Sequence, residues 1–126
     1  MYTVVLLDEP LIPGSNTHVA HVEEHEPDSP FRADRITEII GGKPRPLFLD
    51  DDRIMWVPEN PEDTYNYRVN PVATVIAHEN GSLLYNQVVR GRAVITGNAS
   101  DVQDYRHPRP VPLTPEQLHR CIRDVS

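Results

Sequence analysis

The chain has one cysteine, Cys121, and one lysine, Lys43, and only 6% of its 126 residues are aromatic. One cysteine excludes an internal disulfide and every zinc module that is built from several thiolates. No apolar run approaches the ~20 residues that a membrane-spanning helix needs. The opening residues, MYTVVLLDEP, have neither the basic start nor the small-residue cleavage site of a secretion signal. We therefore expect a cytoplasmic protein that makes no membrane contact.

Positive charge is also scarce, because 12 basic residues stand against 19 acidic ones and the formal net charge is −7. Binding to a nucleic-acid backbone depends on Lys and Arg side chains that displace counterions, so this balance argues against DNA or RNA as a partner. Much of the acidic excess lies between Asp50 and Asp63, where six acids accompany a single base, Arg53. Such a segment would attract a partner protein with a basic patch.

Length and composition favour a single domain over residues 1–126. A chain of this length, with 38% hydrophobic and 25% charged residues, can bury a core of its own. The 13 prolines predict long turns and connections between the elements.

Strand patterns recur along the chain. Residues 2–8 form an apolar, β-branched run that is typical of a buried strand. Residues 47–49 and 54–57 predict two strands joined by a tight turn, and we expect the carboxylates of this turn, Asp50 to Asp52, to be hydrated. Residues 86–98, NQVVRGRAVITGN, alternate enough to predict another strand.

The stretch THVAHVEEHEP, residues 17–27, contains three histidines, for which two periodicities compete. On a helix, His18, His21 and His25 would share one face, as metal ligands often do, whereas a strand divides them between two faces. Two β-branched valines and the lack of an N-terminal cap favour a strand, paired with residues 2–8 and holding no structural metal. His21 and His25, with the distant His107, are weak candidates for metal ligands, and we expect no cofactor.

Residues that commonly start or end helices occur in three further stretches. In residues 28–42, Asp28 or Ser29 can cap a helix that the paired Gly41 and Gly42 end, and we expect a positive φ at one or both glycines. In residues 70–81, Asn70 is the cap, and the residues expected to face inward are Val72, Val75 and Ile76. In residues 113–125, Thr114 and Gln117 form a capping box. The elements together predict an α+β fold, a mainly antiparallel sheet of about five strands with three helices in the order ββαββαβα.

The segments ITEIIGGKPRPLFLDDDRIMWVPEN, NPVATVIAHENG and VVRGRAVITGNASD, followed by LTPEQ, run over about residues 35–118. Together they resemble the small phage, plasmid and actinobacterial family catalogued as domain of unknown function 3846. In that family, a helix ends in paired glycines before a hairpin, an Asn-led helix follows, and a Gly-containing strand comes next. The resemblance implies a phage or mobile-element setting and a cytoplasmic α+β domain, with no known activity and no catalytic residue.

No catalytic constellation stands out in the sequence. No serine lies in a G-x-S-x-G elbow, and on a helix Cys121 and His119 point away from each other. Arg90 and Arg92, on either side of Gly91, are instead candidates for binding a small anion, although two such arginines commonly form a solvated face.

A proline-rich loop with aromatic and acidic side chains follows the second strand of the hairpin. Long loops are frequently functional, and aromatic side chains with polar tips anchor many protein interfaces. The candidate partner-binding residues are Trp56, Glu59, Glu62, Asp63, Tyr65 and Tyr67. The alternative is that Trp56 belongs to the core and the tyrosines cover the loop.

We therefore interpret the chain as a non-enzymatic phage or mobile-element accessory protein that binds a host protein through this acidic, aromatic-bearing surface. The alternative function is a binding module that sequesters a small anionic, nucleotide-like ligand at Arg90 and Arg92. A metal-dependent enzyme that uses the histidine cluster is the third hypothesis.

Overall fold

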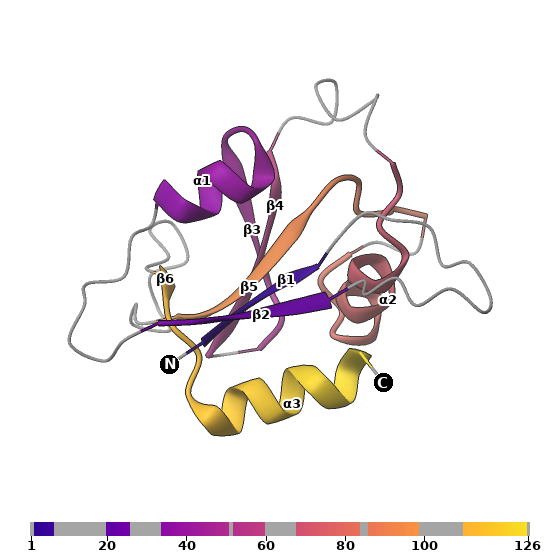
Figure 1. The fold of residues 1–126 in the computed structure, drawn as a ribbon. Helices are drawn as coiled ribbons and strands as arrows, with labels where there is room; N and C mark the ends of the chain where they lie inside the picture. Colours follow the sequence, from indigo (N-terminus) through magenta and orange to yellow (C-terminus); the bar gives the residue numbers. More distant parts are fainter. Residues whose placement is uncertain are drawn as a thin grey trace, which may run out of the picture.

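One antiparallel sheet with three helices forms the protein in the computed structural model, which describes residues 2–6, 20–25, 34–50, 52–59, 68–83, 86–98 and 110–125. In chain order the elements are β1 (Tyr2–Leu6), β2 (Ala20–Glu24), α1 (Asp34–Ile40), β3 (Pro44–Phe48), β4 (Arg53–Pro58), α2 (Pro71–Glu79), β5 (Ala93–Asn98), β6 (Pro110–Val111) and α3 (Pro115–Val125) (Figure 1). The strand order is β2-β1-β5-β4-β3, and β6 pairs with β5. The predicted α+β fold is confirmed, and the two-residue β6 is an addition that is too short to leave a periodicity in the sequence.

The stretch of three histidines is a strand over its described part. β2 pairs antiparallel with β1, so that Val22 lies opposite Val4 and His21 opposite Val5. The predicted strand is confirmed for Ala20–Glu24, while His18 lies outside the described residues.

Helices cover both faces of the sheet (Figure 1). On one face, α1 buries Ile36, Ile39 and Ile40, as its periodicity predicts. These three pack with sheet residues of that face, namely Val5, Ile54, Trp56 and Val94. On the other face, the larger cluster includes Ile76 of α2 and Cys121 of α3. Alternate residues of each central strand therefore serve two separate cores.

The inward face of α2 differs from the predicted one. Asn70 and Pro71 begin the helix as expected, but Val75 is 52% exposed, and the buried residues are Ala73, Ile76 and Ala77. The buried Asn70 side chain explains this rotation, because its amide donates to the carbonyl groups of Leu6 and Gly91. A helix whose cap is tied into the sheet cannot turn to bury Val75.

β3 begins earlier than the sequence pattern indicates, at Pro44 rather than Leu47. Leu49 donates its backbone N–H to the Arg53 carbonyl, and Glu59 donates its backbone N–H to the Lys43 carbonyl. The backbone N–H and C=O groups of the odd-numbered residues of β3 therefore point toward β4. Pro44 and Pro46 occupy the alternate positions, whose backbone nitrogens face away from the sheet. Proline costs no ladder hydrogen bond at such positions of an edge strand.

Gly41 is the glycine that stops α1. Its φ is 82°, and its N–H donates to Thr37 at 2.9 Å, as expected for a glycine C-cap. We expect Gly41→Ala to lower the free energy of unfolding by about 1 kcal/mol, since a side chain is strained at that φ. Gly42→Ala is the control, because a Cβ there would meet no atom within 4 Å. Urea denaturation measures both, and equal stabilities of the two variants would place the helix stop elsewhere.

Candidate functional site

A hollow of about 150 Å³ opens where the β3–β4 hairpin meets the chain that leads into β5. Five of its seven lining residues are aliphatic, and its charged side chains are two arginines. The lining residues are Arg45, Val57, Pro58, Leu83, Val88, Val89 and Arg90. Both arginines are exposed residues.

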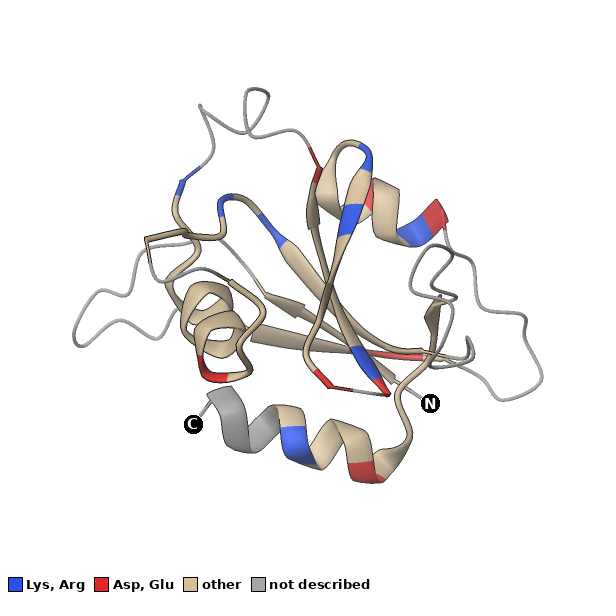
Figure 2. Cartoon of the chain, turned by 180° about the vertical axis from the view of Figure 1, so that it is seen from behind, with Lys and Arg blue, Asp and Glu red and all other residues tan. Residues whose placement is uncertain are grey.

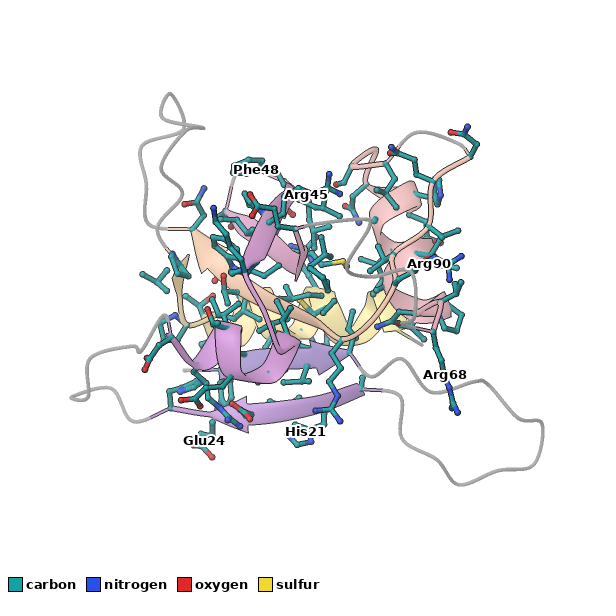
Figure 3. The ribbon with its side chains drawn as sticks, turned by 90° about the horizontal axis from the view of Figure 1, so that it is seen from above. His21, Glu24, Arg45, Phe48, Arg68 and Arg90 are labelled. Carbon is teal, nitrogen blue, oxygen red and sulfur yellow. The ribbon has the colours of Figure 1, made fainter. Side chains whose placement is uncertain are left out.

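Arg45 and Arg90 reach this hollow from different parts of the fold (Figure 3). Arg45 lies in β3 opposite Val57 of β4. Arg90 forms an isolated bridge with Val69, and the next residue, Gly91, has a φ of 82° and donates its N–H to the Arg68 carbonyl. The positive φ of Gly91 turns the chain from this bridge into β5.

Several basic residues lie at one end of the sheet because of the directions in which the strands run. β4 is antiparallel to both β3 and β5, so β3 and β5 run in the same direction and begin at one end. Basic residues lie at or just before these two starts or on the bridged segment beside them: Lys43, Arg45, Arg68, Arg90 and Arg92. Figure 2 shows the blue segments of the ribbon at this end, which we call the basic end. Glu59 is also there, and its carboxylate lies 3.4 Å from the Lys43 ammonium group.

Arg90 and Arg92 do not lie in β5, although the sequence pattern predicts a strand over residues 86–98. β5 starts only at Ala93, because Gly91 interrupts the extended chain before it. Of the two arginines, Arg90 lines the hollow, and its companion there is Arg45 rather than Arg92. The sequence contains no signal for this pairing, because it depends on how the β3–β4 hairpin is placed against residues 83–90.

At the opposite end of β3 and β4, acidic and basic side chains form ion pairs. The side chain of Arg53 is only 5% exposed, and its Nε lies 2.8 Å from Asp50 Oδ2. Arg120 of α3 lies 2.8 Å from Asp52 and 3.5 Å from Asp50. The carboxylates of Asp50 and Asp52 are therefore partly exposed, as expected for this turn, but a buried arginine and α3 also compensate their charge.

The two carboxyl groups have opposite pKa shifts. Burial raises the pKa of Asp50 above its usual value, and a hydrogen bond with Asp52 adds to the rise. Burial acts in the same direction on Asp52, but hydrogen bonds from Asp50, Gln117 and Arg120 outweigh it and lower the pKa of Asp52 to about 2. Asp52 therefore remains ionised in the folded protein under conditions in which an unfolded chain would bind a proton.

We expect Asp52→Asn to remove a contribution to the free energy of unfolding that depends on pH. A lowered carboxyl pKa stabilises the fold above the unfolded value of 3.8, and this contribution disappears as the pH falls through about 2. Since the Asp52 side chain is 48% exposed, we expect a loss of about 1 kcal/mol near neutral pH and little loss at about pH 2. Urea denaturation against pH measures the difference, with Glu79→Gln on α2 as the control. A loss that is independent of pH would contradict the assignment.

The candidate partner-binding residues fall into two groups. Trp56 lies in the core beneath α1, is 7% exposed and donates its indole N–H to Thr96, so the core interpretation of this residue is the correct one. Glu59 is exposed at the basic end. The remaining four, Glu62, Asp63, Tyr65 and Tyr67, lie outside the described residues.

The histidines of β2 and its end make ordinary side-chain contacts. His25 Nε2 lies 3.0 Å from Thr3 Oγ1, and His21 Nε2 lies 3.9 Å from Glu23 Oε1. Within the described part of the chain, no three His, Cys, Asp or Glu side chains gather closely enough to hold a metal ion. His107 lies outside the described residues.

Comparison of the chain with family models, with curated proteins and with solved structures finds no match. Among the helices that the structure describes, none has the length and apolar character to cross a membrane. The function must therefore be inferred from the geometry and charge of the hollow and of the surfaces around it.

Proposed function

We propose that the protein is a non-enzymatic binding module that takes a small anionic ligand in the hollow between Arg45 and Arg90. The observation that carries this proposal is that two arginines and five aliphatic residues line one hollow, at the end of the sheet where basic residues gather. The alternative drawn from the sequence, an anion held by Arg90 and Arg92, is thereby revised to a different pair of arginines.

The lining indicates which chemistry the ligand has. A guanidinium group presents a planar fork of N–H donors that matches carboxylate and phosphate oxygens. Val57, Pro58 and Val88 add aliphatic side chains to the same lining. A ligand that has an anionic group on a compact apolar or planar body, as a mononucleotide has, fits both features.

The same lining supports binding rather than catalysis. Arginine stays protonated in proteins and does not serve as a general base, and the other lining side chains are aliphatic. The setting in a phage or mobile element, which the resemblance implies, remains part of this proposal. A protein of that kind would withhold its ligand from other proteins rather than convert it.

We expect guanosine monophosphate to raise the melting temperature and to shift the backbone amide resonances of Arg45 and of Val88 to Arg90, since a ligand that binds only the native state stabilises it. Arg45→Gln and Arg90→Gln should each weaken binding by about tenfold or more, because each removes charged hydrogen bonds to the anion. Isothermal calorimetry measures the affinities, with inorganic phosphate and citrate as further probes.

Arg92→Gln is the matched control, because it removes the same charge from the same segment without touching the hollow. An equal loss of affinity in Arg92→Gln would mean that the basic end attracts anions diffusely and that the hollow is not the site. The absence of any resonance shift with all three probes at millimolar concentration would contradict the proposal.

Binding of a host protein through residues 50–67 remains a prediction. In the described part of that segment, Asp50, Asp52 and Glu59 are each ion-paired within the protein, to Arg53, Arg120 and Lys43. Attraction to a basic partner would then depend on residues outside the described part. The hollow is for this reason the better-supported site.

A further inference from the structure

The two edges of the sheet differ in their capacity to accept another strand. At one edge, Pro44 and Pro46 occupy the positions of β3 whose backbone nitrogens face away from β4, so these positions have no N–H to offer. At the other edge, β2 contains no proline. Among the described residues, β2 has β1 as its only neighbouring strand.

Backbone hydrogen bonds define which residues of β2 face outward. Tyr2 exchanges two hydrogen bonds with Leu113, so the backbone groups of Tyr2, and of alternate residues after it, face Leu113 and β5. Thr3 and Val5 therefore face β2, where they lie opposite Glu23 and His21. The backbone groups of the other three residues of β2 point away from the sheet, and these residues are Ala20, Val22 and Glu24.

The outer edge of β2 also presents an apolar side chain. Val22 is 47% exposed, although its neighbour across the strand pair, Val4, is 3% exposed. Figure 3 shows β2 as the outermost strand on its side of the sheet, with His21 and Glu24 pointing away from the molecule. In the part of the chain that the structure describes, no further strand lies against this edge, and such an edge with an exposed β-branched residue at its centre is a template for strand addition.

We propose that this edge pairs with the β2 strand of a second copy of the chain, antiparallel and about a two-fold axis at Val22. For all five residues of β2 to pair with those of the second copy, the axis must pass through the central residue. Val22 then lies opposite Val22 of the second copy, and Ala20 lies opposite Glu24. The outward N–H and C=O groups complete a ladder, and the two sheets become one.

Side-chain charge favours this register over its neighbours. In the proposed pairing, His21 of each copy lies opposite Glu23 of the other, at the positions where cross-strand side chains are closest. Shifting the axis by one residue would place Glu23 opposite Glu23, or His21 opposite His21. Arg35 already holds the Glu23 carboxylate at 2.6 Å, so this acceptor is oriented before the second copy arrives.

Sedimentation equilibrium on the full chain tests the proposal. We expect a reversible dimer at a protein concentration of about 100 μM, because a small interface supports only weak association. Val22→Lys should weaken the dimer by at least about tenfold, since it places two like charges at the axis. The matched control is Val75→Lys. Val75 has a similar exposure, 52%, but lies on α2 rather than on the edge strand, so this change should leave the dimer unchanged. A monomer at about 1 mM, or an equal loss in both variants, would overturn the proposal.

Charge changes at His21 test the register itself. His21→Lys should strengthen the dimer at neutral pH and His21→Glu should weaken it, because in the proposed pairing the residue opposite is Glu23 of the second copy. Amide hydrogen exchange at Val22 and Glu24 should slow as the protein concentration rises, while the amide spectrum confirms that each variant is folded. A weaker dimer in His21→Lys together with a stronger one in His21→Glu, or exchange at these amides that does not depend on concentration, would overturn the pairing.

Discussion

Replacing Asn70 with aspartate is expected to lower the free energy of unfolding by about 3 kcal/mol or more at neutral pH. Asn70 is fully buried, and its carboxamide makes three hydrogen bonds. Oδ1 accepts from the N–H of Ala73 at 3.1 Å, and Nδ2 donates to the carbonyl groups of Leu6 at 3.1 Å and Gly91 at 3.0 Å. This one side chain therefore joins α2 to the end of β1 and to the turn before β5.

Aspartate keeps the capping bond but turns a donor into an acceptor that faces two carbonyl oxygens. A buried carboxylate in that position is unpaired, so its pKa should rise above that of an exposed aspartate. The folded protein then favours the protonated form, and stability should fall as the pH rises from the unfolded pKa through the raised folded one. Asn70→Asp should accordingly be less destabilised, relative to the wild type, in mild acid than at neutral pH.

Urea denaturation at both pH values measures this difference. The control is Asn86→Asp, at an exposed position, which should change stability by less than about 0.5 kcal/mol. Asn70→Ala is a second comparison, which removes the hydrogen bonds without adding charge and should be destabilised equally at the two pH values. If Asn70→Asp were as stable as the wild type at neutral pH, the two donated hydrogen bonds would not hold the sheet and α2 together.

The second large effect is expected at Arg53. Replacing it with methionine should cost about 2–3 kcal/mol, because Asp50 loses a partner at 2.8 Å in a mostly buried site. The loss is kept below that of a fully buried pair because Asp50 is 30% exposed and Arg120 lies 3.5 Å away. Chemical denaturation measures the change in the free energy of unfolding.

Arg35→Met provides the comparison for Arg53. Arg35 also forms short ion pairs, with Glu23 and Glu38, but its side chain is 45% exposed, so its removal should cost no more than about 1 kcal/mol. The double change Arg53→Met and Asp50→Leu should restore part of the stability, since no unpaired carboxylate then remains. Equal losses in Arg53→Met and Arg35→Met would show that burial adds nothing to the Arg53 pair.

The elements that depend on neighbours in sequence were predictable. Thr114 and Gln117 exchange the two hydrogen bonds of a capping box at the start of α3, and Gly41 has the positive φ that the paired glycines indicate. The strand at Ala20–Glu24 agrees with its β-branched Val22 and with the lack of a helix cap before it. These features depend on steric preferences and hydrogen bonds within a few residues, and such preferences are present in the local sequence.

The tertiary structure alone decided where the charged and polar groups meet. Arg45 comes to Arg90 because the register of the hairpin and the turn at Gly91 place both at the basic end. Arg53 is buried among groups from α3, although an arginine after three aspartates has the pattern of a solvated turn. Contacts of this kind join residues far apart in sequence and depend on strand order and side-chain packing. The sequence by itself determined the helices and the longer strands in their order, whereas the hollow, the ion pairs and the outer edge of β2 exist only once the sheet has formed.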